Sequence, residues 1–288
     1  MSSRAPTPDG EDRAPRAAAG PPGPSDTAGC SSRVAAPASG GAIVLIHGWG
    51  MHGGIWSELL PALEGYEPRL TPDLPGHGGA PCPEGPYGLD EITAALAPEV
   101  PPGATVLGWS LGAMIALNLA RRHARRVSRL VLVSATPRFT NSDDWDCGIA
   151  DGVFDLFART LVSDYRQTLN RFLSLQVRGS ATSRSTLRLL RSVLFARGEP
   201  QQAALAGGLE ILRHADLRAW LGEIRQPAHV IAGLRDRLVP PAASRALAAA
   251  LPAGRFTELP EAGHAPFVSH RTEFLSALSA PATTEAPA

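Results

Sequence analysis

Short, fully apolar runs recur along the chain from residue 42 onward. Four of them have the length and continuous apolar character of strands buried on both faces of a parallel sheet: AIVLI (42–46), ATVLGW (104–109), RLVLVSA (129–135) and AHVIAG (228–233). Two weaker segments extend the set, PRLTPDLPGHG, with a strand ending at Asp73, and RFTEL (255–259). The pattern therefore predicts a sheet of mostly parallel strands.

Segments with helical spacing fill the intervals between these runs. Apolar residues cover much of 111–122, PAASRALAAALP has helical character, and a terminal helix begins near His270. Strands that alternate with helices indicate β-α-β units, which wrap a parallel sheet on both faces. The expected fold class is α/β.

Residues 139–217 break this alternation. They contain no obvious buried strand and show helical spacing instead, in VFDLFARTLVSDYRQTLNRFLSLQV, STLRLLRSVLFA and AALAGGLEIL. We predict a helical cap at 139–217, inserted into a core made of residues 41–138 and 218–280.

Both ends of the chain have a different composition. Residues 1–40 are rich in proline, alanine, glycine and serine, and residues 281–288 are similar. Such segments bury too little apolar surface to offset the entropy lost on ordering. We predict a disordered tail at each end.

Composition narrows the classes of function. The 288-residue chain is 44% hydrophobic and 19% charged, with a formal net charge of zero, so no overall field favours nucleic acid or an anionic membrane. No apolar run reaches the roughly 20 residues that span a bilayer, and the N-terminus lacks the apolar region of a signal peptide. Cys30, Cys82 and Cys147 are far apart and match no disulfide framework or metal-ligand spacing. We expect a cytoplasmic monomer without metal or cofactor.

One pentapeptide carries a candidate chemistry. GWSLG, from Gly108 to Gly112, fits the pattern G-x-S-x-G directly after a predicted strand and before a predicted helix. A serine alone in this pattern also fits a small polar residue in a tight turn. In this context the turn lifts Ser110 above the sheet, and the helix N-terminus favours negative charge beside it. The context favours a nucleophile.

A serine hydroxyl needs a base to become a good nucleophile. In hydrolases with this turn, the acid and then the histidine follow the serine along the chain. Asp236 follows the strand 228–233, and His264 lies in AGHAPF after the last strand. All three positions are at carboxyl ends of strands, where open α/β sheets bind ligands. We predict that His264 is the base and that Asp236 orients it.

Other acids and histidines have weaker positions. Asp73 precedes the serine and Asp216 ends the helical insertion, while three histidines lie on or beside helices: His123, His214 and His270. His47 and His52 share the segment HGWGMHGG, but no third ligand is placed to complete a metal site.

The oxyanion of an acyl-transfer reaction needs two N–H donors. The backbone of Leu111, directly after the nucleophile, is one candidate. The loop after the first core strand supplies the other, and the backbone N–H of Trp49 is the candidate there.

Longer segments resemble one family. LIHGWGMHGGIW, PDLPGHG, LGWSLGAMIAL, DLRAWLGEIRQP and AGHAPFVSH look like the pimeloyl-[acyl-carrier protein] methyl ester esterases of the α/β-hydrolase superfamily, over residues 42 to 280. The resemblance implies an α/β-hydrolase fold and a serine hydrolase that removes the methyl group from pimeloyl-acyl carrier protein methyl ester in biotin synthesis. It also implies that Trp49 and Leu111 occupy substrate-binding and oxyanion positions, and that Phe172 lines an acyl channel in the cap.

The predicted cap is strongly basic. Residues 163–197 hold seven arginines and one aspartate, a local net charge of +6 in a neutral chain. Acyl carrier proteins are acidic, and arginine pairs well with carboxylate and phosphate. By resemblance, the carrier-contacting arginines are Arg171, Arg184 and Arg188, while Gln167 replaces a further arginine of the family. A solvated helix face in a chain without lysine is the alternative explanation.

The sequence leaves three functions open. The resemblance favours the carrier-bound methyl ester as substrate and the acyl carrier protein as partner. A generic short-chain carboxylesterase or a C–C bond hydrolase would use the same serine, acid and histidine. A non-catalytic ligand-binding protein is the alternative of another class, although such proteins usually lose one of these three residues. The strand pair that this family has before LIHGWG also lacks a clear counterpart, because only RVAAPASGG precedes it.

Overall fold

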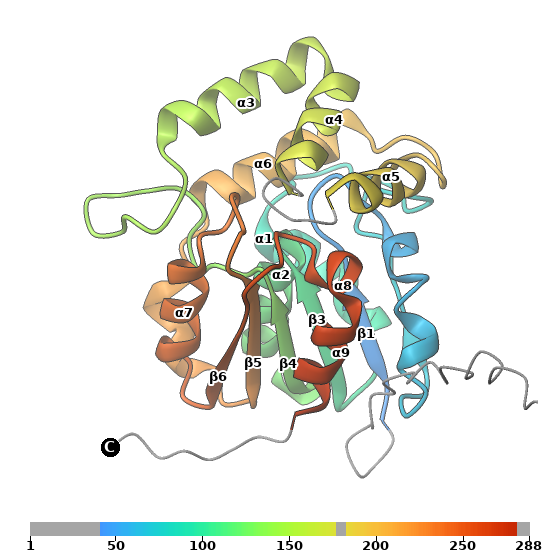
Figure 1. Ribbon diagram of the computed structural model, residues 1–288, viewed down its shortest axis with the longest axis vertical. Coiled ribbons are helices and arrows are strands. Elements are labelled where there is room, and N and C mark those ends of the chain that lie inside the picture. Colours follow the sequence, from blue (N-terminus) through green and yellow to red (C-terminus); the bar gives the residue numbers. More distant parts are fainter. Residues whose placement is uncertain (1–40, 177–182, 281–288) are drawn as a thin grey trace, which may run out of the picture. The chain divides into compact units, whose positions relative to one another are not determined.

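The computed structural model describes residues 41–176 and 183–280. The predicted tails and the possible first strand pair lie outside these residues. Six parallel strands form one sheet in the order β2-β1-β3-β4-β5-β6 (Figure 1). Their bounds are β1 Ile43–Ile46, β2 Arg69–Leu70, β3 Ala104–Trp109, β4 Val127–Val133, β5 Ala228–Gly233 and β6 Gly254–Leu259.

Helices cover both faces of this sheet. The α-helices outside the cap region are α1 Leu89–Leu96, α2 Leu111–Arg122, α7 Pro241–Ala250, α8 Pro266–Ser269 and α9 Arg271–Ser279. Short 3₁₀ helices complete the connections: η1 Gly53–Trp56, η2 Leu60–Ala62, η3 Ala97–Glu99, η4 Ala124–Arg126 and η5 Arg218–Glu223. Helix α1 was not predicted, although Asp90 and Glu91 give its first turn the acidic residues that favour a helix N-terminus.

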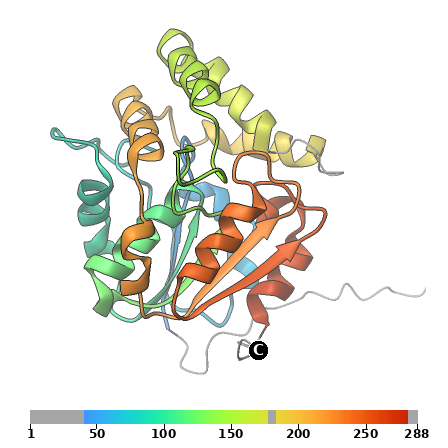
Figure 2. The same cartoon turned by 90° about the vertical axis from the view of Figure 1, so that its left-hand side faces the viewer.

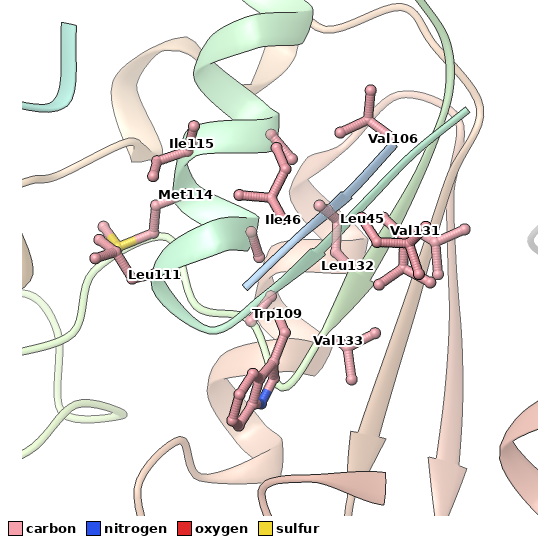
Figure 3. Close-up of a cluster of buried hydrophobic side chains, with 14 of the residues drawn as sticks. Leu45, Ile46, Val106, Trp109, Leu111, Met114, Ile115, Val131, Leu132 and Val133 are labelled. Carbon is pink, nitrogen blue, oxygen red and sulfur yellow. The ribbon is translucent and has the colours of Figure 1, made fainter. Parts of the chain in front are cut away.

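Side-chain alternation along β3 separates the two layers. Gly108 faces α2 so closely that a Cβ on it would lie 2.6 Å from the Cα of Ala113. Trp109, the next residue, points to the opposite face and packs against Phe267 of α8, with 5.1 Å between ring centroids. Figure 3 shows Trp109 at the end of β3, beside the first turn of α2. The end of β3 thus lies between α2 on one face and α8 on the other.

The core is built from strands with no polar face. Every residue of β1, β3 and β5 is buried, as expected for central strands of a parallel sheet covered on both sides. In α2, ten of twelve residues are buried, and only its C-terminal arginines reach solvent. Strand β4 ends at Val133 rather than at residue 135, because Ser134 takes a positive φ of 47°, which a strand does not allow.

The described residues of the segment predicted as a cap, 139–176 and 183–217, contain four α-helices. They are α3 Asp151–Ser163, α4 Tyr165–Gln176, α5 Ser183–Leu194 and α6 Gln202–His214. Figures 1 and 2 show them gathered over one edge of the sheet. Asp164 separates α3 from α4, because its side chain accepts a hydrogen bond from the N–H of Gln167 (2.9 Å) and caps α4.

The two connections between this segment and the sheet are joined. Arg138 and Asp216 form an antiparallel bridge, and their side chains make an ion pair of 3.1 Å. Arg218 adds a second ion pair to Asp216, and these arginines lower the pKa of Asp216 to about 2, with the hydrogen bond from Arg218 as the largest cause. Asp216, which the sequence left as a possible catalytic acid, therefore holds the chain connections together.

Candidate active site

Ser110 occupies a strained turn between β3 and α2. Its φ of 56° and ψ of −117° lie outside the regions that residues with a Cβ usually adopt. Its N–H donates to the carbonyl of Val133 (3.0 Å), so the turn is tied to the end of β4. Backbone strain of this kind costs about 1–3 kcal/mol and is typical of functional positions.

The glycines on either side make the turn possible. A Cβ at Gly108 would lie 2.4 Å from the carbonyl oxygen of Gly112, and a Cβ at Gly112 would lie 2.4 Å from the carbonyl oxygen of Ile46. Both distances are far below van der Waals contact. Only glycine lets β1, β3 and the first turn of α2 approach this closely.

This packing leads to a stability prediction. We expect Gly112→Ala to lower the free energy of unfolding by about 2 kcal/mol or more, because backbone must move to admit the methyl group. Gly152→Ala is the matched control, since a Cβ at Gly152 in α3 meets nothing within 4 Å. Urea unfolding of both variants measures the difference. Equal stabilities would show that α2 can shift without cost.

Asp236 and His264 form a buried pair. Asp236 lies three residues beyond β5, where its Oδ1 accepts hydrogen bonds from the N–H groups of Leu238 (2.8 Å) and Val239 (2.9 Å). Its other oxygen, Oδ2, accepts from Nδ1 of His264 (2.8 Å). Neither side chain is more than 1% exposed. The carboxylate therefore fixes both the ring orientation and the tautomer of the histidine.

This pairing leaves Nε2 of His264 as the nitrogen available for proton transfer. Nε2 is buried and has no hydrogen-bond partner among the described residues. Trp109 holds the loop that carries His264, because its Nε1 donates to the backbone carbonyl of His264 (2.8 Å). Ser110 is itself buried, being 8% exposed, and directly follows β3 at the carboxyl end of the same sheet. Hydrogen bonds between a catalytic serine and histidine often form only when substrate is bound.

The chain is similar to known proteins over most of its described length. A family profile described as alpha/beta hydrolase fold matches residues 41–271. Proteins named pimeloyl-[acyl-carrier protein] methyl ester esterase, from Xanthomonas campestris pv. campestris (strain B100) and Xylella fastidiosa (strain M12), are 43% and 42% identical to this chain. Each alignment covers 83% of this chain and 94% of the relative. The chain belongs to this esterase family.

Solved structures confirm the predicted α/β-hydrolase fold. The esterase EaEST from Exiguobacterium antarcticum has a TM-score of 0.75 at 22% identity, with 83% of this chain and 91% of that chain covered. A bromoperoxidase from Bacillus anthracis has a TM-score of 0.74 at 21% identity, with the same coverage. A hydrolase from Pseudomonas aeruginosa PA01 is 27% identical, with a TM-score of 0.67 over 85% of this chain and 91% of its own.

In this member of the esterase family, Trp49 links the sheet to the cap helices. Its ring is buried, its Nε1 donates to the carbonyl of Leu205 in α6 (2.9 Å), and it packs edge-on against Phe157 and Phe172. The corresponding centroid distances are 5.4 and 5.1 Å. Leu111 is the first residue of α2 and is also buried. Trp49 and Phe172 thus contact each other from the loop after β1 and from α4, while Leu111 directly follows the strained turn at Ser110.

The three predicted carrier-contact arginines lie on exposed positions of α4 and α5. Arg171 is on α4, and Arg184 and Arg188 are on α5; all three are exposed. None of them makes an ion pair with another described residue, and neither does Arg191 on α5. By contrast, Arg166 pairs with Glu199 and Arg197 with Asp73. Arg178 of the same basic stretch lies outside the described residues.

The two histidines of the first loop have structural partners. Nε2 of His47 accepts from the N–H of Leu74 (2.9 Å), and His52 accepts from Gly54 and donates to the carbonyl of Val193 (2.6 Å). Burial lowers the pKa of His47 to about 3, with His77 adding to the effect. Within residues 41–176 and 183–280, no group of three or more potential ligands is arranged to hold a metal ion.

The structure adds site features that the sequence did not single out. Trp109 supports the His264 loop, which the spacing of the motif does not indicate, and the amides of Leu238 and Val239 hold the acid. Phe157 pairs with Phe172 across the cap helices, with ring centroids 5.5 Å apart.

No helix among those described is long and apolar enough to cross a bilayer.

Proposed function

We propose that this protein is a serine carboxylesterase that hydrolyses the methyl ester of pimeloyl-acyl carrier protein in biotin synthesis. The observation that carries the proposal is the buried Asp236–His264 pair, whose free Nε2 lies at the same edge of the sheet as the strained Ser110. The family relationship at 43% identity supports the choice of substrate. The cytoplasm is its predicted location, and a monomer its predicted state.

The reaction starts with proton transfer from Ser110 Oγ to Nε2 of His264. Oγ attacks the ester carbonyl carbon, and the resulting imidazolium is stabilised by Asp236. When the tetrahedral intermediate collapses, the carbon–oxygen bond to the methoxy group breaks and His264 returns the proton, which releases methanol. Water then gives a proton to His264 and attacks the acyl-Ser110 ester. Collapse releases the free carboxylate and restores the serine.

Negative charge on the carbonyl oxygen needs stabilisation in both steps. The backbone N–H of Leu111 is at the first position of α2, where amide groups have no partner within the helix. The backbone N–H of Trp49, in the loop after β1, is the proposed second donor. Removing one donor of this kind costs about 2.7–4 kcal/mol in transition-state stabilisation in other enzymes.

The aromatic side chains of Trp49 and Phe172 suit the methylene chain of the acyl group. Both are nearly fully buried and in contact with each other, from the core loop and from α4. We propose that Phe172 lines the acyl channel and that Trp49 forms its wall on the core side. An apolar channel at this place would guide the ester to Ser110 while the carrier stays outside.

The exposed arginines of α4 and α5 fit the carrier itself. Arg171, Arg184 and Arg188 have no carboxylate partner among the described residues, so binding an acidic protein would break no ion pair there. Arg191 lines the same shallow groove as Arg171 and Gln167, and it adds a further positive charge beside the position that lacks the family's arginine. We propose that this surface docks the acyl carrier protein.

Neutralising this surface should affect only carrier-bound substrate. For Arg184→Gln with Arg188→Gln, we expect kcat/KM for pimeloyl-acyl carrier protein methyl ester to fall by roughly tenfold, more at low salt than at high salt. Activity on short p-nitrophenyl esters should stay unchanged, because those esters do not need the arginines.

The matched control is Arg125→Gln with Arg225→Gln. Both residues are exposed and precede strands β4 and β5, at the opposite edge of the sheet. The control should leave both activities unchanged. An equal loss on both substrates in the α5 variant, or no loss, would contradict carrier docking. Cleavage of small esters alone by the wild type would favour a generic carboxylesterase or a C–C bond hydrolase.

A further inference from the structure

The aromatic side chain next to the nucleophile makes a long-range contact with the loop of the base. Trp109 directly precedes Ser110 in the chain, and its side chain is buried. Its Nε1 donates a hydrogen bond to the backbone carbonyl of His264 (2.8 Å), which lies 155 residues further along the chain. One side chain therefore joins the turn that holds the nucleophile to the loop that holds the base.

The same indole contacts this loop at a second point. Phe267 of α8 lies three residues after His264, and its ring centroid is 5.1 Å from that of Trp109. Trp56 and Phe274 also pack against Phe267, with ring centroids 4.4 and 6.1 Å away. The loop is thus fixed to Trp109 through its backbone at His264 and through a packed side chain at Phe267.

Asp236 alone does not fix the position of the histidine ring. Its contact with His264 is one hydrogen bond at Nδ1 (2.8 Å), about which the imidazole can pivot. Nε2 lies on the far side of the ring and moves most in such a pivot. The hydrogen bond from Trp109 restrains the backbone from which the ring projects, so the two contacts together determine where Nε2 lies.

We propose that Trp109 is a positioning residue for proton transfer, which sets the distance between Ser110 Oγ and His264 Nε2. Trp109 acts through His264 and receives no proton itself. A displacement of about 1 Å can lower the rate of an enzyme by about 100-fold, so the hydrogen bond to the histidine backbone controls kcat. The inference rests on the proposed esterase reaction, in which both steps use His264 as the base.

A role in packing alone would have different consequences, and Trp56 provides the comparison. Trp56 and Trp109 are buried tryptophans of one aromatic cluster, with ring centroids 6.4 Å apart. Nε1 of Trp56 has no hydrogen-bond partner among the described residues. Trp56 therefore shares the residue type and the cluster with Trp109, and it lacks the hydrogen bond to the loop of the base.

Trp109→Phe and Trp56→Phe separate positioning from packing, because each removes an indole N–H and part of a ring from the same cluster. In Trp109→Phe we expect kcat for a p-nitrophenyl ester to fall by about tenfold to 100-fold, with KM changed by less than about twofold, because both chemical steps slow together. Trp56→Phe should keep the wild-type kcat. Circular dichroism and urea unfolding check that both variants are folded at the assay temperature.

Replacement of the indole nitrogen alone removes the hydrogen bond and keeps the packing. β-(3-Benzothienyl)alanine has the shape of tryptophan, with sulfur in place of the N–H. At position 109 it should lower kcat as much as Trp109→Phe does, and at position 56 it should leave kcat unchanged. A wild-type kcat with this residue at position 109, or an equal loss at both positions, would show that Trp109 acts by packing and would overturn the proposal.

Diisopropyl fluorophosphate gives a second measurement that needs no ester. When Ser110 Oγ displaces fluoride from phosphorus, its proton passes to His264, so the rate constant should fall in Trp109→Phe by a similar factor and stay unchanged in Trp56→Phe. An unreactive Ser110 in the wild type would contradict the proposed function itself. A reactive Ser110 with equal rate constants in the wild type and Trp109→Phe would contradict only the role of Trp109.

Discussion

Replacing Ser110 with alanine is expected to lower kcat for ester hydrolysis by roughly 10⁴-fold to 10⁶-fold, as removing the nucleophile does in other serine hydrolases. The reason is that no other hydroxyl can replace the Ser110 hydroxyl, which is held on the strained turn between β3 and α2. Steady-state rates on pimeloyl-acyl carrier protein methyl ester and on a p-nitrophenyl ester measure the effect. Both activities should fall together, because both use the same acyl-enzyme.

Ser128→Ala is the matched control for this substitution. Ser128 lies near the start of β4, at the other end of the sheet, and its hydroxyl donates to the carbonyl of Gly103 (2.7 Å). Activity of this variant should be unchanged. A fluorophosphonate should label the wild type and not the Ser110 variant. If the wild type neither reacts with the reagent nor cleaves esters, the protein is a non-catalytic ligand-binding member of the superfamily.

We expect acid to begin to destabilise the protein near pH 6.5, which is well above the pH range in which carboxylates become protonated. Burial lowers the pKa of three histidines from 6.5: His47 to about 3, His77 to about 4 and His229 to about 3. Below pH 6.5 the unfolded chain binds protons at these positions and the folded chain does not. Their contribution to stability is therefore complete above pH 6.5 and is lost as the pH falls toward 4 and 3.

The expected slope is large because the three histidines act together. Each contributes about 1.4 kcal/mol per pH unit, so the free energy of unfolding falls by up to about 4 kcal/mol per pH unit below pH 6.5. Urea unfolding at pH 7.5, 6.5, 5.5 and 4.5 measures this slope. A stability that does not change between pH 6.5 and 4.5 would show that these side chains gain protons in the folded state.

His229 offers a way to test the contribution of a single residue. Its Nδ1 accepts from Arg255 (2.7 Å), and its Nε2 hydrogen bonds with Thr257 Oγ1 (2.9 Å). Protonation would remove the acceptor for the Arg255 guanidinium and place two positive charges together. His229→Gln keeps a polar side chain that does not titrate, so the pH slope should fall by about a third. His214→Gln, an exposed histidine on α6, should leave the slope unchanged.

Local patterns predicted the central sheet well. The strands β1, β3 and β5 are short, continuous apolar runs, and burial on both faces leaves them no polar positions that could obscure the signal. Helix α1, which has only eight residues, was missed although its apolar residues Ile92 and Leu96 lie on one buried face. The end of β4 was placed two residues too late. Ser134 and Ala135 are small and carry no turn signal in the sequence, but the backbone turns at Ser134.

The sequence by itself determined the fold class, the strained turn at Ser110 and the family, because short motifs and local apolar patterns carry all three signals. It also placed Asp236 and His264 at strand ends, which is a matter of order and pattern. The sequence also predicted that Asp236 would orient His264, and the structure shows the two side chains in hydrogen-bond contact. Only the tertiary structure shows why the rival Asp216 has another role, since it pairs with two arginines. The same is true of the hydrogen bond from Trp109 to the backbone carbonyl of His264. These depend on distances between segments far apart in sequence, which packing sets and local pattern does not encode.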